Sequence, residues 1–385
     1  MKLLFCHDHY FYTYKKNLYS PGKFTNSSFE RYFPFFKEIT ILSREKKYTN
    51  NSFFNKIDDK RISFIPFDNL STLRNRFFLR KKYKKKIITI INNYDGIIVR
   101  LPSEIGFLVA ECCSIIKKPY LVEAVACPVD AMKSLKSLKS ICYTPIIKKQ
   151  MERSILNASA VIYVTNHFLQ NRYPTKGFKI SASNVELNNV VSEYKSIGLK
   201  HKKELNLTLI GNLDSHHKGY SILYKALYLL AKENTEYYFN VYLIGAGEYY
   251  KKNNLSNHSN INIIFTGALP KDKVINILKI TDIYLQPSSQ EGLPRATIEA
   301  MSQAIPCIVS SAGGLPELID KNFVHDKNDY TKLKSLIVTL INDNEQYIKQ
   351  SKINLYNSKF YKKQIVTEKR NNAFKYYINE LLRKK

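Results

Sequence analysis

The sequence has no run of apolar residues that approaches the roughly 18 needed for a membrane-spanning helix, so we expect any contact with a membrane to be peripheral. After Lys2, the apolar run at 3–6 is too short for a secretory signal peptide, and we expect it to form a buried first strand. The six cysteines show no C-x-x-C spacing and two are adjacent, which argues against a zinc site and a disulfide framework. These absences favour a protein of the reducing cytoplasm.

Patterns that bind metal ions are missing as well. There is no D-x-D triplet, and the His-Asp-His run at 7–9 is too compressed for a tetrahedral site without further ligands. We therefore expect no metal ion and no resident cofactor.

Acidic residues are scarce relative to basic ones: 32 Asp and Glu stand against 60 Lys and Arg, for a net charge of +28. Such an excess attracts nucleic acid, anionic lipid or phosphorylated ligands alike, so charge alone does not choose the partner. Apolar residues make up 44% of the 385 residues, which is typical of a folded globular chain. At about 150 residues per domain, the length suggests two or three domains.

Short apolar runs rich in β-branched residues recur along the chain and alternate with longer amphipathic segments, which predicts α/β domains with buried parallel strands and helical crossovers. In the first half these runs lie at 2–6, 38–42, 62–66, 96–100, 120–126 and 160–164. In the second half they lie at 207–211, 239–245, 261–265, 282–287 and 306–310, with helical patterns at about 218–232, 271–280, 294–304 and 328–342. Two doubly wound, Rossmann-like domains are the natural assignment.

Periodicity is lost in a polar stretch from about 181 to 204, which marks the seam between the domains. We therefore expect an N-terminal domain over 1–190 and a C-terminal domain over 191–385. The tail at 361–385 is basic and helical in pattern, and we expect that this C-terminal helix can pack back on the N-terminal domain.

The most informative segment is Ser288–Ile319, which contains EGLPRATIEAM. A loop after a predicted strand carries Glu291, and Glu299 lies about a turn and a half into the next helix. Both carboxylates can therefore face the crevice at the carboxyl end of the sheet, where open α/β folds bind ligands. The amides of Gly292 and Leu293 lie near the helix N-terminus and suit an anionic group. Two carboxylates beside an anion site suit a nucleotide sugar.

A second segment, Leu209–Leu227, runs from a strand through a loop to a helix that opens at Lys218 and Gly219. The lysine ammonium and the helix amides converge there on a position suited to a diphosphate. In LIGAGE, Gly245 and Gly247 permit a tight turn close to a nucleotide.

Together these segments resemble the retaining glycosyltransferases of family four, and the resemblance spans nearly the whole chain. It implies the GT-B architecture, in which two Rossmann-like domains face each other across a cleft. Glu291 and Glu299 match the E-x7-E pattern of that family. The resemblance implies that Glu291 contacts hydroxyls of the donor sugar and that Glu299 accepts hydrogen bonds from the ribose. It also implies that Lys218 grips the donor diphosphate, so Glu291 and Lys218 are the expected catalytic residues.

The sequence departs from the family pattern at several positions. The family has an arginine shortly after the strand glycine, here Gly211, but Asn212 occupies that place. Arg295 or His217 can compensate for the missing positive charge at the donor diphosphate. The glycine-rich loop that approaches the donor in the N-terminal domain has one counterpart glycine, Gly22. The donor-binding set implied by the resemblance is Glu299, Gly292, Leu293, Arg295, Asn212, Gly211, Gly245, Gly247 and Gly22.

Acceptor-side candidates come from the N-terminal half. Family members often carry a histidine after the strand that 120–126 represents, whereas Glu123 and Asp130 occupy that neighbourhood here. Arg100 ends the strand at 96–100 and also faces the expected cleft. For Glu123, a buried structural carboxylate is an equally good interpretation.

A basic amphipathic segment at 73–86 can lie on an anionic bilayer, where each Lys or Arg contributes about 1 kcal/mol. Its basic residues are Arg74, Arg76, Arg80, Lys81, Lys82, Lys84, Lys85 and Lys86, interleaved with Leu73, Phe77, Phe78 and Leu79. A solvated helix face is the alternative interpretation.

We expect a retaining glycosyltransferase that moves a hexose-type sugar from a UDP- or GDP-sugar to a cell-surface glycan such as capsule or O-antigen. By analogy, the acceptor is polyprenyl-linked, and the protein is peripheral on the inner face of the cell membrane. One alternative is a GT-B nucleotide-sugar epimerase or a non-catalytic subunit. The other is a basic nucleic-acid-binding protein, which the lack of any nucleic-acid-binding motif disfavours, so we expect no nucleic-acid partner.

Overall fold

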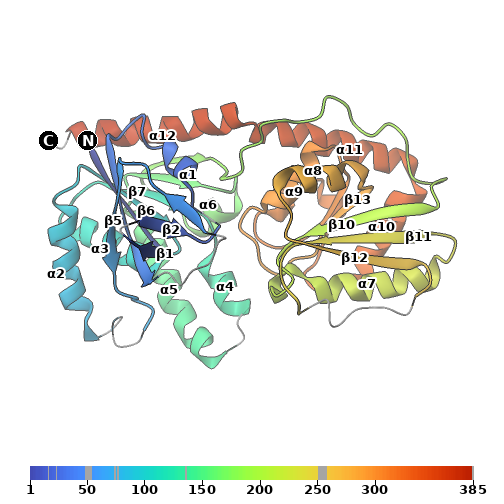
Figure 1. Ribbon diagram of the computed structural model, residues 1–385, viewed down its shortest axis with the longest axis horizontal. Coiled ribbons are helices and arrows are strands. Elements are labelled where there is room, and N and C mark those ends of the chain that lie inside the picture. The colour runs from blue at the N-terminus through green and yellow to red at the C-terminus, as the bar shows by residue number, and fades with distance from the viewer. Residues whose placement is uncertain are drawn as a thin grey trace. The chain divides into compact units, whose positions relative to one another are not determined.

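The computed structural model describes residues 1–15, 17–22, 24–47, 54–72, 75, 78–134, 137–249 and 258–383. The chain forms two compact units. Unit 1 comprises Met1–Ala182 and Thr367–Lys385, and unit 2 comprises Ser183–Val366. Each unit is an α/β domain built on a largely parallel sheet, so the expected fold class is confirmed (Figure 1).

The division differs from the expected boundary at 190/191. Val185 and Leu187 pack in the hydrophobic core of unit 2, so the boundary lies at 182/183. Residues 367–385 belong to unit 1, because the apolar face of the C-terminal helix α12 (Lys363–Arg383) packs into its core. Within that core the ring centroids of Phe374 and Tyr32 are 5.5 Å apart. The Tyr377 hydroxyl accepts a hydrogen bond of 2.8 Å from the amide of Ile97.

In the described part of unit 1, nine strands form one sheet. Its parallel part has the order β5-β3-β1-β6-β7-β8-β9, and β2 and β4 extend β1 in antiparallel fashion. The strands are β1 (Lys2–Tyr14), β2 (Asn17–Ser20), β3 (Glu38–Lys47), β4 (Asn55–Ile57), β5 (Ile62–Phe67), β6 (Gly96–Leu101), β7 (Leu121–Ala124), β8 (Ala160–Tyr163) and β9 (Phe178–Ser181). The helices are α1 (Asn26–Glu30), α2 (Arg80–Ile91), α3 (Glu104–Ile115), α4 (Pro128–Ser134), α5 (Leu138–Leu156) and α6 (Phe168–Arg172), besides α12.

The first strand is longer than the apolar run at 2–6 indicates. It continues to Tyr14 because its second part pairs with β2 on one side, where Tyr12 lies opposite Tyr19, and with β3 on the other. Backbone pairing on both sides sustains the strand after its continuous apolar pattern ends.

In unit 2, the described residues form a six-stranded parallel sheet of order β12-β11-β10-β13-β14-β15. Its strands are β10 (Glu204–Ile210), β11 (Tyr238–Ile244), β12 (Ile261–Gly267), β13 (Ile283–Gln286), β14 (Cys307–Ser310) and β15 (Val324–His325). The helices are α7 (Tyr220–Glu233), α8 (Lys271–Ile280), α9 (Arg295–Ser302), α10 (Tyr330–Asn342) and α11 (Asn344–Ser358), with short 3₁₀ turns η2 (His216–Lys218), η3 (Leu315–Glu317), η4 (Lys321–Phe323) and η5 (Lys359–Tyr361). This strand order is that of a Rossmann fold. From β10 the chain first adds strands on one side, β11 and β12, and then on the other side, from β13 onwards, so the topological switch point lies between β10 and β13.

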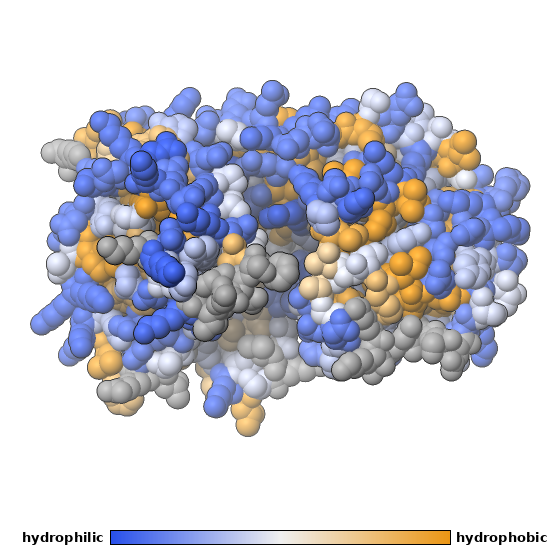
Figure 2. All heavy atoms as spheres, in the orientation of Figure 1, coloured by the Kyte–Doolittle hydropathy of each residue, from blue (hydrophilic) through white to orange (hydrophobic). Residues whose placement is uncertain are grey.

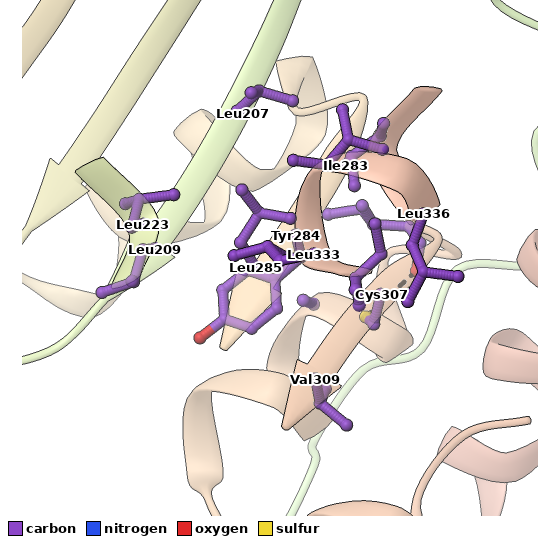
Figure 3. Packing of buried hydrophobic residues seen from close by; sticks show 14 of the residues in the cluster. Leu207, Leu209, Leu223, Ile283, Tyr284, Leu285, Cys307, Val309, Leu333 and Leu336 are labelled. Carbon is purple, nitrogen blue, oxygen red and sulfur yellow. Dashed lines mark hydrogen bonds between the residues drawn. The ribbon is translucent and has the colours of Figure 1, made fainter. Parts of the chain in front are cut away.

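The central strands of the unit 2 sheet are buried because their β-branched and aliphatic residues form one core, whereas the edge strand β12 is only partly buried. Figure 3 shows Leu207 and Leu209 of β10 beside Ile283 and Leu285 of β13, packed with Leu223 of α7 and Leu333 of α10. Each of these side chains is fully buried. The packed sheet thereby fixes where its loops emerge.

Among the helices of the described residues, none combines the length and the apolar character required to cross a membrane.

Candidate active site

Four loops of unit 2 emerge at the carboxyl ends of neighbouring parallel strands. They follow β10 at 211–215, β11 at 245–248, β13 at 287–294 and β14 at 311–314. The first and third flank the point at which the strand order reverses. In open α/β sheets the ligand crevice lies at such a point, outside the carboxyl ends of the strands.

Lys218 and Glu291 meet at this position. The lysine Nζ lies 2.8 Å from the glutamate Oε1, and the Ser288 hydroxyl donates a hydrogen bond of 2.8 Å to the same oxygen. Both charged side chains are largely enclosed, with 21% of Lys218 and 10% of Glu291 exposed. The structure therefore brings the two expected catalytic residues into one ion pair and adds Ser288, which the motif comparison did not single out.

Two glycines hold the loop that carries Glu291. A Cβ on Gly219 would lie 2.0 Å from the Pro287 carbonyl oxygen, and one on Gly313 would lie 2.0 Å from the Glu291 carbonyl oxygen. Both glycines have positive φ, of 81° and 58°. Any side chain there would displace the loop, so the backbone contacts set the position of Glu291.

Backbone hydrogen bonds reinforce the same arrangement. The amide of Ser289 donates to the His217 carbonyl at 2.8 Å, and the amide of Gly314 donates to the Gly292 carbonyl at 2.8 Å. Leu293, next in the chain, packs against the hydrophobic core of unit 2. The loop is thus tied on both sides to neighbouring loops, which gives a preorganised site.

The loops after β10 and β11 touch through glycine. Gly245 has φ of 156°, and a Cβ on it would lie 1.8 Å from the carbonyl oxygen of Gly211. Gly247 has φ of 117°, and a Cβ on it would lie 2.6 Å from the amide nitrogen of Asp214. The glycines expected to permit a tight turn therefore permit close approach of two loops.

Asn212, at the position where the family has an arginine, helps to shape its own loop. Its side-chain oxygen accepts a hydrogen bond of 2.8 Å from the amide of Asp214. Asp214 in turn accepts hydrogen bonds from the amides of Glu248 at 2.9 Å and Tyr249 at 3.0 Å. Asp214 is a positioning residue that sequence reasoning missed, because its partners lie 34 and 35 residues away.

Glu299 lies in α9, and its carboxyl is partly buried. Burial raises the pKa of Glu299, and the positive charges of Arg295 and Lys271 oppose that rise without cancelling it. Arg295 is the first residue of α9 and is exposed. A partly buried carboxylate near cations is suited to accept hydrogen bonds from ligand hydroxyls.

The N-terminal candidates Glu123 and Arg100 are paired with each other. Glu123 of β7 is buried, and one carboxylate oxygen lies 2.8 Å from the Arg100 guanidinium while the other accepts a 2.8 Å hydrogen bond from the Tyr32 hydroxyl. Burial raises the pKa of Glu123, but the charges of Arg100, Arg31 and Arg370 outweigh burial and hold the pKa below its usual range. This geometry fits the structural interpretation of Glu123.

Asp130 and Gly22 lie elsewhere in unit 1. The Asp130 carboxylate pairs with Arg172 at 2.8 Å, and the same guanidinium nitrogen lies 2.9 Å from the Cys127 sulfur. Gly22 follows β2, has φ of 73°, and has no other atom within 4 Å of the position that a Cβ would take. Its backbone is therefore open to a ligand, whereas Asp130 is already engaged.

The basic segment at 73–86 is described only in part, since positions 73, 74, 76 and 77 lie outside the described residues. In its helix α2, Tyr83 and Ile87 are buried, and Lys84 pairs with Glu111 at 2.7 Å. Arg80 pairs with the same carboxylate. The exposed face of α2 carries Lys81, Lys82, Lys85 and Lys86, and Phe78 just before the helix is 84% exposed.

Within the described residues, no group of three or more His, Cys, Asp or Glu side chains is placed to hold a metal ion. His7 is partly buried, and its Nδ1 lies 3.1 Å from the Arg100 carbonyl oxygen. Burial, joined by the charge of Arg100, lowers the pKa of His7 to about 3.

Comparisons with known proteins cover nearly the whole chain. Residues 191–355 match the family described as glycosyl transferases group 1. Protein CapJ of Staphylococcus aureus is 32% identical over 345 residues, which span 88% of this chain and 85% of that protein. A UDP-Gal:alpha-D-GlcNAc-diphosphoundecaprenol alpha-1,3-galactosyltransferase of Escherichia coli is 34% identical over 76 residues, 19% of this chain and 20% of that enzyme. Anabaena HepE, crystallised with UDP and glucose, aligns over 97% of this chain and 99% of its own, with a TM-score of 0.62 and 16% identity.

Proposed function

Because the chain belongs to the group 1 glycosyltransferases and has the GT-B fold, we propose that it is a retaining enzyme that transfers a hexose-type sugar from a UDP-sugar to a lipid-linked glycan acceptor. The observation that carries the proposal is the Lys218–Glu291 pair at the carboxyl edge of the parallel sheet, where β10 and β13 meet. A lysine and a carboxylate side by side match a ligand that carries a diphosphate next to sugar hydroxyls.

The ion pair suggests how the donor is received. Without donor, Lys218 and Glu291 neutralise each other's charge. A bound diphosphate supplies a stronger counter-charge for the ammonium, which leaves Glu291 to accept hydrogen bonds from the sugar. Ser288 keeps the carboxylate in place during this exchange, since it already donates to the same oxygen.

Transfer requires the bond between the anomeric carbon and the diphosphate to break. Negative charge then develops on the leaving diphosphate, and preorganised donors that face it lower the barrier. Lys218 supplies a full positive charge there, and the loop amides next to α9 supply oriented dipoles. The glycine contacts hold the backbone of these loops in place, so donor binding requires mainly that Lys218 exchange Glu291 for the diphosphate.

Three features support a lipid-linked acceptor and action at the inner membrane surface. The Escherichia coli relative acts, by its name, on a diphosphoundecaprenol-linked sugar. The net charge of +28 and the exposed lysines of α2 favour an anionic surface. The six cysteines are free thiols, which suits a reducing compartment.

A panel of nucleotide sugars tests the proposal directly. We expect UDP and one or more UDP-sugars to raise the thermal unfolding midpoint, and slow hydrolysis to release UDP without acceptor. Absence of any response across UDP- and GDP-sugars would contradict it. Conversion of the donor to its epimer would instead identify an epimerase, and salt-sensitive binding of oligonucleotides alone would identify a nucleic-acid-binding protein.

The raised pKa of Glu299 predicts how UDP affinity depends on pH. Ribose hydroxyls donate to the ionised carboxylate, so UDP binding favours the deprotonated form. As the pH falls through the raised pKa, the carboxyl gains a proton and affinity falls. At pH 7, Glu299→Gln should weaken UDP binding by about 10- to 100-fold, the value of hydrogen bonds to a charged group.

Calorimetric titration with UDP from pH 5 to pH 8 measures this effect. Protonation of the UDP phosphate affects binding to the unaltered protein and to Glu299→Gln equally. The ratio of their dissociation constants for UDP therefore reports the ionisation of residue 299 alone. We expect the ratio to shrink towards acid pH, and a constant ratio would remove Glu299 from the nucleotide site.

A further inference from the structure

Unit 1 contains a cavity of about 860 Å³ that the donor site does not use. It lies between α3 and α5, beyond the carboxyl end of β6. Its apolar lining includes Phe107 of α3, Met132 of α4, and Leu138, Ile146 and Ile147 of α5. The volume lies within the range of small-molecule sites, and the position is the edge of the sheet at which α/β domains bind ligands.

The helix α5 that forms one wall has an apolar face towards solvent. Leu138 is 81% exposed, Ile141 62% and Ile146 39%, and Cys142 beside them is exposed as well. The spacing of these positions places them on one side of a helix. The opposite side, with Met151 and Ile155, is buried in the unit. Figure 2 shows apolar atoms at the tip of this α4–α5 hairpin, which Figure 1 shows projecting from the sheet.

Lysines surround this apolar face. Lys133 of α4 and Lys139, Lys148 and Lys149 of α5 are exposed. Cations around an apolar helix face complement a ligand that joins a hydrocarbon chain to a phosphate.

The two carboxylates that line the cavity already have partners. The Asp8 carboxylate accepts hydrogen bonds from the first two amides of α3, including that of Ile105 at 3.0 Å. The Glu104 carboxylate accepts a hydrogen bond from the Tyr143 hydroxyl. These two carboxylates would repel a phosphate inside the cavity, so the phosphate belongs at the lysine-rich rim and the interior suits a hydrocarbon chain.

We propose that the cavity and the exposed face of α5 bind the isoprenoid chain of a lipid-linked acceptor, with its phosphates at the surrounding lysines. The proposal rests on the proposed function in taking the acceptor to be lipid-linked. It assigns the acceptor's lipid to α3, α4 and α5, which the motif comparison did not select.

Cys142 offers a test in the unaltered protein, because it lines the cavity and is the exposed one of the six cysteines, all of which lie in the described residues. We expect farnesyl phosphate at about ten times its dissociation constant or more to slow maleimide labelling of Cys142 by about tenfold, because the bound chain covers the thiol and only about a tenth of the protein stays unliganded. Inorganic phosphate should leave the rate unchanged. An unchanged rate with farnesyl phosphate, or equal slowing by inorganic phosphate, would overturn the proposal.

A second measurement uses the absence of tryptophan from the chain. In Leu138→Trp the single indole should shift its emission to the blue on phosphatidylcholine vesicles that contain undecaprenyl phosphate. The matched control Tyr356→Trp, 61% exposed in unit 2, should not respond. An equal shift when phosphatidylglycerol replaces undecaprenyl phosphate would show a general membrane contact and overturn the assignment to the acceptor lipid.

Activity separates this inference from the proposed function. Leu138→Glu/Ile141→Glu should raise KM for a polyprenyl-linked acceptor by about tenfold or more and leave UDP affinity and donor hydrolysis unchanged. Ile197→Glu, at an 82% exposed position in unit 2, is the matched control and should leave KM unchanged. An unaltered KM in the double variant would contradict the lipid site, whereas lack of UDP-sugar turnover by the unaltered protein would contradict the proposed function.

Discussion

Replacing Lys218 by alanine will lower kcat for sugar transfer by about 10²- to 10³-fold, the loss expected when one preorganised group that faces developing negative charge is removed. The ammonium lies 2.8 Å from Glu291 in a largely enclosed position, so water cannot fully replace its charge. The variant also leaves the Glu291 carboxylate with Ser288 but without its cation, which places negative charge next to the diphosphate. Steady-state kinetics with the UDP-sugar that turns over measures the change.

Two variants control this prediction. Lys232→Ala removes an exposed lysine near the end of α7 and should leave kcat within about twofold, as is usual for surface changes. Lys218→Arg keeps the charge but not the shape of the ammonium, and it should recover part of the rate. If Lys218→Ala raised KM alone and kept kcat, the lysine would stabilise the bound donor and the transition state equally, and it would not act on the leaving group.

Replacing Glu123 by leucine will lower the free energy of unfolding by about 3–5 kcal/mol, the usual result of removing one partner from a buried ion pair. Glu123 is buried and balances Arg100 directly, with Arg31 and Arg370 near enough to lower its pKa. Without the carboxylate, the partly buried Arg100 would lose its ion-pair partner, and Arg31 and Arg370 would lose the attraction of a nearby negative charge. Chemical denaturation measures the loss, and Glu236→Leu at an exposed position should show little change.

The acid limb of stability supplies a second readout for Glu123. Its folded-state pKa is lowered, so its contribution is present above the unfolded-state pKa and is lost as the pH falls through the folded-state pKa. Glu123→Leu should lack this part of the acid dependence. Unchanged stability with lost transfer would identify Glu123 as an acceptor-binding residue instead.

The sequence predicted the main parallel strands of both domains, but not the short strands β2, β4, β9 and β15. The strands of unit 2 at 204–210 and 283–286 contain the predicted short apolar runs, because a parallel strand that is covered on both faces is mostly apolar. The E-x7-E pattern at Glu291 and Glu299 is local, since a loop and the helix that follows it are continuous in the chain. Local patterns of this kind predict both the fold and the family.

Only the tertiary structure decided which distant residues meet. It brought Gly313 against Glu291, placed the boundary between the domains at 182/183, and paired Glu123 with Arg100. It also gave α5, a helix that the sequence analysis did not predict, two apolar faces, one buried and one exposed beside a cavity. Periodicity indicates which residues of a segment are buried, but not which residues they contact. Those contacts depend on how segments far apart in the sequence pack in the folded chain.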